Sequence, residues 1–168
     1  MSGKRLRYHS IGSALLLGGM VFAVGTALGF EHIGGYIPCK LCLEPRIPYY
    51  IGIPLMAVTF AFAWMRLPGT LLRLMLAAGG LLMLWGLVLA IYHSGVEWQW
   101  WAGPADCGAV DAAPDTGGQG VLDMLDNVVP PSCDQAAGRF LGLSFAGWNV
   151  LASLGLAAIA FRAALAKE

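Results

Sequence analysis

Long apolar stretches alternate with short polar segments along the 168-residue chain. Four stretches contain no Asp, Glu, Lys or Arg, and they cover Ile11–Phe30, Ile47–Met65, Leu74–Tyr92 and Phe140–Phe161. Each is close to the length of about 20 apolar residues that a helix needs to cross a bilayer. In hydrocarbon only helices and closed barrels satisfy their own backbone, and these stretches lack the alternation of barrel strands. The pattern therefore predicts an all-α membrane protein built as a four-transmembrane-helix bundle.

The composition supports a lipid environment. Hydrophobic residues make up 58% of the chain and charged residues 12%, whereas soluble domains carry about 25% charged residues. The length suits a single domain over residues 1–168. The formal net charge is zero, which argues against a nucleic-acid partner.

The first apolar stretch has two interpretations. Basic residues precede it, as they precede a cleaved signal peptide. Its apolar run is longer than the roughly 7–15 residues of a signal-peptide core. We therefore expect it to remain as the first transmembrane helix.

The basic residues predict the orientation in the membrane. With four spans, seven of the ten Lys and Arg residues fall on the side of both termini: Lys4, Arg5, Arg7, Arg66, Arg73, Arg162 and Lys167. The other three are Lys40, Arg46 and Arg139. Because cytoplasmic loops are enriched in Lys and Arg, we expect both termini in the cytoplasm and the two remaining loops outside, in a bacterial inner membrane.

The two predicted external loops cover residues 31–46 and 93–139, and they hold all four cysteines, Cys39, Cys42, Cys107 and Cys133. This placement fits a compartment that permits disulfides. Within the longer loop, Val121–Val129 places apolar residues at helical spacing, which predicts a short amphipathic helix on the membrane surface.

The segment Cys39-Lys40-Leu41-Cys42 is a CxxC pair, a pattern shared by redox sites, structural disulfides and metal sites. Pro45 suits the first turn of a helix, so the second span is expected to begin directly after the pair. The positive end of that helix and the cation of Arg46 would favour a thiolate on Cys42. These conditions favour redox exchange, although the motif alone leaves all three uses open.

The other candidate readings concern zinc and two interfacial residues. Four cysteines can form a tetrahedral zinc site, but 25 residues separate Cys107 from Cys133, and an oxidising compartment disfavours free thiolates. We therefore expect no metal.

Arg46 suits either an anchor at the membrane interface or a donor to a polar head group. Together with His93, at the external end of the third span, it could frame a quinone ring.

Three runs resemble the disulfide bond formation protein B (DsbB) family. CKLCLEPRIPYY is similar to the family's cysteine pair followed by an arginine. YHSGVEWQWWAGPADC is similar to the stretch that leads to the third cysteine, and CDQAAGRFLGLSFAGWNVL to the fourth cysteine and last span. The resemblance covers nearly the whole chain.

The resemblance implies a thiol:quinone oxidoreductase that re-oxidises a periplasmic, DsbA-like thioredoxin-fold oxidase. Cys107 would form the mixed disulfide with this partner, and Cys133 would resolve it and exchange with Cys39. Cys42 would face the quinone, with Arg46 and His93 close to its ring. Ubiquinone is the expected quinone and menaquinone the alternative.

Three other functions fit parts of the sequence. Vitamin K epoxide reductase-like proteins also combine four helices, a CxxC and a quinone, but their CxxC lies late in the bundle. A non-enzymatic membrane protein would use its disulfides only to staple the loops. A transporter is disfavoured because the four apolar stretches contain no charged side chain.

Overall fold

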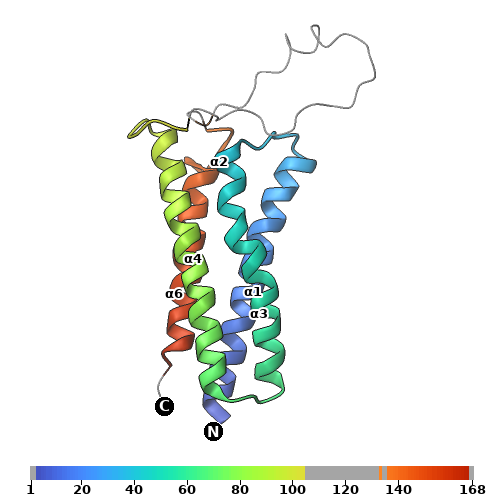
Figure 1. Cartoon of the computed structure of the whole chain (residues 1–168). Coiled ribbons are helices and arrows are strands. Elements are labelled where there is room, and N and C mark those ends of the chain that lie inside the picture. The colour runs from blue at the N-terminus through green and yellow to red at the C-terminus, as the bar shows by residue number, and fades with distance from the viewer. Residues whose placement is uncertain (1–2, 105–132, 134–135, 167–168) are drawn as a thin grey trace, which may run out of the picture.

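A computed structural model describes residues 3–104, 133 and 136–166, with side chains from Tyr8 onward. Four long helices run side by side as one elongated bundle (Figure 1). They are α1 (Gly3–His32), α3 (Ile47–Trp64), α4 (Gly69–Glu97) and α6 (Phe145–Ala164). All four contain segments long and apolar enough to cross a membrane. The predicted all-α, four-helix membrane class is therefore confirmed.

The observed helices differ from the predicted spans mainly at their ends. The third helix, α4, begins five residues before the predicted Leu74 and ends five residues after the predicted Tyr92. At about 1.5 Å per residue its 29 residues span roughly 43 Å, which exceeds a hydrocarbon core of about 30 Å. The ends of α4 therefore project into the interfacial regions, beyond the uncharged segment that the hydropathy pattern detects.

The predicted start of the last span at Phe140 is wrong. Strand β1 (Arg139–Phe140) pairs antiparallel with β2 (Leu143–Ser144) in a small hairpin. Its turn contains Leu141 and Gly142, both with positive φ. Ser144 then caps α6, because its hydroxyl accepts a hydrogen bond from the Gly147 backbone N–H. Phe140, Leu141 and Leu143 of this hairpin are apolar. The hydrophobic run in the sequence therefore begins before the helix itself.

Small residues allow the helices to pack closely. A Cβ added to Gly12 of α1 would lie 2.5 Å from the Ala163 Cβ of α6. A Cβ added to Gly80 of α4 would lie 2.9 Å from the Phe161 ring of α6. Close approach of backbones through small residues is a common way for membrane helices to associate.

A buried polar cluster joins two helices, α3 and α6, within the apolar core. The Tyr49 hydroxyl of α3 donates to Asn149 Oδ1 at 2.8 Å and lies 2.8 Å from Ser153 Oγ, both on α6. Gly86 of α4 leaves room beside Ser153. The Tyr49–Asn149 hydrogen bond therefore helps to hold α3 against α6.

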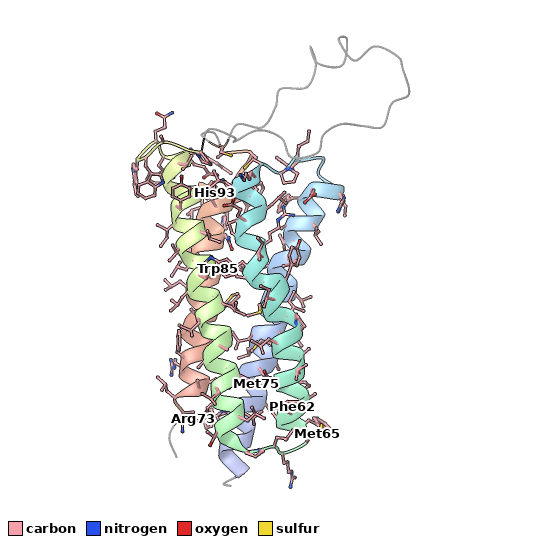
Figure 2. The ribbon with its side chains drawn as sticks, viewed as in Figure 1. Phe62, Met65, Arg73, Met75, Trp85 and His93 are labelled. Atoms are coloured by element: carbon pink, nitrogen blue, oxygen red, sulfur yellow. The ribbon has the colours of Figure 1, made fainter. Side chains whose placement is uncertain are left out.

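The two ends of the bundle are different. One end holds two short elements, α2 (Lys40–Leu43) and the 3-10 turn η1 (Glu44–Arg46), directly before α3. His93 lies at this end, whereas Met65 and Arg73 lie at the opposite end (Figure 2). There Arg73 Nε donates to the Ala164 carbonyl at 2.8 Å, which satisfies a backbone acceptor at the end of α6. The start of α1 and the end of α6 also share this opposite end (Figure 1).

The predicted surface helix at Val121–Val129 lies outside the described residues, as does Cys107.

Candidate active site

The CxxC pair lies where the second membrane helix begins. Cys39 is the residue before α2, with extended backbone angles, and Cys42 lies within α2. The Cys42 backbone N–H donates to the Cys39 carbonyl at 2.9 Å. This turn brings the two sulfurs to 2.9 Å, close enough for a thiol–thiol hydrogen bond. Both cysteines are free thiols.

The second long helix, α3, begins at Ile47 as the sequence predicts, but α2 and η1 extend the helical segment back to Lys40. Pro45 lies in the 3-10 turn η1, which connects α2 to α3. Proline has no backbone N–H, so Pro45 donates no helical hydrogen bond. The helix α2 before it still forms, because its hydrogen bonds do not need a donor at position 45. The helical segment therefore begins at Lys40, and Cys39 rather than Cys42 stands at its N-terminal boundary.

Helix α4 adds an imidazole to the two thiols. His93 is 5% exposed, and a ring nitrogen of His93 lies within 4.8 Å of both sulfurs. Its Nε2 also lies 3.6 Å from Glu97 Oε1, one helical turn further along α4. The side chains of His93 and Glu97 are only 7% and 5% exposed. The site thus contains two thiols, an imidazole and a carboxylate, largely shielded from solvent.

The surroundings favour a thiolate on Cys39. The hydrogen bond with the Cys42 thiol lowers the pKa of Cys39, and burial opposes this effect. His93 lowers the pKa further, both as a hydrogen-bond partner and through positive charge. The net effect holds the Cys39 pKa well below its ordinary value. Sequence reasoning placed the thiolate on Cys42 from the helix start after the pair and the cation of Arg46, and it did not include the short helix α2 that begins directly after Cys39.

Cys133 belongs to the same buried cluster as the CxxC pair. It is 3% exposed and shares this cluster with Cys39, Leu41 and Val96. Cys42 packs against the cluster. Cys133 is disulfide-bonded. Residues separated by more than ninety positions therefore place three sulfurs at one end of the bundle.

Arg46 occupies a different part of this end of the bundle. It ends the turn η1, and its Nη1 lies 2.6 Å from Glu31 Oε2 on α1. The side chains of Arg46 and Glu31 are 13% and 24% exposed. Nearby on α3, the apolar side chains of Ile47, Tyr50 and Ile51 are about half exposed on the outer surface of the bundle. Arg46 therefore lies where a polar ring could meet the protein while an apolar tail remained in lipid.

Sequence reasoning missed Glu31 and Glu97. Glu97 follows His93 at helical i, i+4 spacing, a signal that was available had the helix been extended past Tyr92. Glu31 had no local signal, because its partner Arg46 lies on another element. Of the predicted site residues, the structure gathers Cys39, Cys42, His93 and Cys133, and places Arg46 against Glu31.

Comparisons with known proteins agree with this arrangement. The family model described as "Disulfide bond formation protein DsbB" matches residues 10–163, most of the chain. The chain is also 27% identical over 152 residues to "Uncharacterized protein RP370" of Rickettsia prowazekii (strain Madrid E). That alignment covers 90% of this chain and 84% of the relative. No solved structure matches the chain significantly. A family match of this extent, on a four-helix membrane bundle with clustered cysteines, shows that the chain belongs to the DsbB family of disulfide bond formation proteins.

Proposed function

We propose that this protein is a thiol:quinone oxidoreductase, which re-oxidises a DsbA-like dithiol oxidase and passes the electrons to a quinone. The observation that carries the proposal is the buried cluster of Cys39, Cys42 and Cys133 beside His93. Sulfurs gathered from separate segments suit sequential disulfide exchange. A purely structural disulfide would not need a neighbouring pair of free thiols with a lowered Cys39 pKa.

The first step exchanges one disulfide with the partner. Cys133 is disulfide-bonded, and the resemblance to the DsbB family implies Cys107 as its mate. A partner thiolate attacks Cys107, a mixed disulfide forms, and Cys133 leaves as a thiolate. The second partner thiolate would then release an oxidised partner, leaving Cys107 and Cys133 reduced. Two electrons and two protons have then moved from the partner to this loop.

The second step moves those electrons to the CxxC pair. The Cys133 thiolate attacks Cys39 of a Cys39–Cys42 disulfide, and Cys42 leaves as a thiolate that takes up a proton. Cys107 then attacks Cys133, restores the loop disulfide and releases Cys39. A leaving thiol departs faster when its pKa is low, so the environment of Cys39 favours this release. The products have the same redox state as the structure, with thiols at positions 39 and 42 and a disulfide at 133.

The last step re-oxidises the CxxC pair. A quinone, when bound, accepts two electrons and two protons and becomes a quinol. The proton shared between the two sulfurs can pass from Cys42 to Cys39, which makes Cys42 the nucleophile that faces the ring. Arg46 would donate to a ring oxygen, and His93 would accept or return a proton beside the sulfurs. Ubiquinone is the expected acceptor, with menaquinone the alternative.

Redox potentials explain why a quinone is needed. DsbA-type oxidases have potentials near about −120 mV because their reduced form is stabilised. Ordinary structural disulfides lie below about −300 mV and cannot oxidise such a partner. The reaction is expected at the outer face of a bacterial inner membrane, with both termini in the cytoplasm and the cysteine loops in the periplasm.

A trapping experiment tests this proposal. In cells that contain a DsbA-like oxidase, the free Cys107 thiol of Cys133→Ser should attack the disulfide of the oxidised partner, and the mixed disulfide should accumulate because Cys133 is absent and cannot displace the partner from Cys107. The adduct should appear on a non-reducing gel and disappear with reductant. Cys107→Ser, the matched control, should form none. Equal trapping by both variants would refute the assigned roles, and no adduct with any thioredoxin-fold protein would argue against the function.

A further inference from the structure

We propose that the reduced CxxC pair and His93 form a binding site for a thiophilic divalent cation such as Zn²⁺. The two sulfurs and a ring nitrogen of His93 lie within 4.8 Å of one another. They come from two elements, α2 with its N-cap and α4, which the bundle holds together. The sequence-based expectation of no metal considered only the four cysteines as ligands and did not include His93.

The spacing of the three atoms is close to what tetrahedral coordination requires. Zinc bonds of about 2.3 Å to sulfur and about 2.0 Å to nitrogen place neighbouring ligand atoms roughly 3.3–3.8 Å apart. The sulfurs, now 2.9 Å apart, would separate by about 0.9 Å to reach tetrahedral spacing, and the most distant pair would close from at most 4.8 Å. Side-chain rotations achieve such changes without moving a helix.

Glu97 is an independent observation that points to a cation. Its side chain is 5% exposed, and its Oε2 has no hydrogen-bond partner among the described residues. A buried carboxylate oxygen without a partner is costly, and a nearby cation would offset that cost. Glu97 lies 3.6 Å from His93 Nε2, the arrangement in which a carboxylate orients a metal-binding histidine.

The site would exist only in one redox state. Zinc binds thiolates, so Cys39 and Cys42 must both be reduced, and the Cys42 thiol must release its proton on binding. A Cys39–Cys42 disulfide has no thiolate to offer. Metal binding and disulfide formation therefore exclude each other at this pair. If the proposed function holds, the cation would reversibly inhibit re-oxidation of the pair, although the binding itself depends on neither partner nor quinone.

Cobalt is a direct probe because thiolate coordination gives it a characteristic near-ultraviolet charge-transfer band. The purified, reduced full-length chain in detergent should bind one Co²⁺ with this band and a tetrahedral visible spectrum, and Zn²⁺ should displace it. The chain with an oxidised CxxC pair should not bind. His93→Ala should bind at least tenfold more weakly, whereas His93→Cys should restore binding with a stronger charge-transfer band. Glu97→Gln should weaken binding roughly tenfold or more, as loss of a partner to a metal ligand does.

Two variants serve as matched controls. His32 is exposed at the same end of the bundle, so His32→Ala should bind cobalt like the wild type. The double variant Cys107→Ser/Cys133→Ser should also bind, which separates this site from the other cysteines. Circular dichroism verifies that each variant is folded.

Two results would overturn the site. One is equal cobalt binding by the reduced and oxidised proteins, and the other is a folded, reduced protein that shows no charge-transfer band. Failure of quinone reduction with intact cobalt binding would refute the proposed function and leave the metal site standing.

Discussion

Arg46 is a cation that the protein keeps mostly buried beside a carboxylate. The bundle exposes only 13% of its side chain and pairs it with Glu31 at 2.6 Å. Surface ion pairs contribute little to stability, so an anchoring role alone does not explain why this pair is shielded. Its position next to the apolar outer surface of α3 suits a donor to the polar ring of a lipid-soluble ligand.

Replacing Arg46 tests this interpretation. Losing a hydrogen bond to a charged group costs about 1.5–3 kcal/mol, and about 1.4 kcal/mol corresponds to a factor of ten. Arg46→Met should therefore raise the apparent quinone KM, or slow the quinone half-reaction, roughly tenfold to hundredfold. Arg46→Lys should recover part of the loss, since it keeps the charge without the planar fork. Steady-state quinone reduction at varied quinone concentration measures this effect.

Two variants separate a quinone contact from a structural ion pair. Arg139 is exposed at the same end of the bundle, so Arg139→Met should leave the quinone KM unchanged. Glu31→Gln removes the ion pair but keeps the cation, and should change the quinone KM less than Arg46→Met does. Equal effects of Glu31→Gln and Arg46→Met would assign Arg46 a structural role, and unchanged kinetics in Arg46→Met would move the quinone site elsewhere.

Among individual residues, the sequence identified those site residues that a local sequence pattern marks. The CxxC spacing identified Cys39 and Cys42, and the ends of the apolar runs directed attention to Arg46 and His93. Which of the two cysteines is favoured as the thiolate depends on where the helical segment begins. The sequence locates such a boundary only to within about one turn. Contacts between distant elements, such as Glu31 with Arg46, have no signature in local sequence.

Helix ends decide the positions of the chemical groups. The apolar pattern located all four membrane helices, because uncharged runs of this length have few other structures available in lipid. It missed the ends of α4, since His93 and Glu97 continue the helix beyond the hydrocarbon. It also merged the hairpin of β1 and β2 with α6, because apolar side chains alone do not distinguish a strand from a helix start. The cap at Ser144 provides that distinction.

The contact between α1 and α6 makes a testable element-scale prediction. Gly12→Ala would place a methyl group 2.5 Å from the Ala163 Cβ, and an alanine side chain cannot rotate away. The helices must separate, which should destabilise the bundle by about 1–3 kcal/mol, as overpacking typically does. Gly18 of the same helix has no described heavy atom within 4 Å of an added Cβ, so Gly18→Ala is the control. Unfolding midpoints in detergent measure both, and equal midpoints would contradict the close contact.

At the scale of the whole molecule, charge is distributed unequally between the two ends. One end of the bundle holds the start of α1 together with Arg66, Arg73 and Arg162. The other end holds the cysteine site together with Lys40, Arg46 and Arg139. The sequence-based count is seven basic residues against three. Such a bias predicts that the richer end lies in the cytoplasm, and the cysteine site would then face an oxidising compartment.

Reporter fusions test this orientation. A reporter that is active only in the periplasm should work when inserted within Ser94–Gly138 and fail when fused after Lys167. The reason is the excess of Lys and Arg at the end that carries both termini. The opposite pattern of reporter activity would place the cysteines in the cytoplasm and would remove the basis for the proposed disulfide chemistry.

The transfer of electrons from thiols to a quinone is the central claim, and anaerobic quinone reduction tests it most directly. Purified protein is mixed with a reduced DsbA-like partner and excess ubiquinone, while quinol formation and partner oxidation are followed together. The account predicts one quinol for each disulfide formed in the partner, whereas Cys42→Ser should form no quinol and should oxidise at most one equivalent of the partner. A folded wild-type protein that oxidises no partner and leaves ubiquinone and menaquinone unreduced would contradict it.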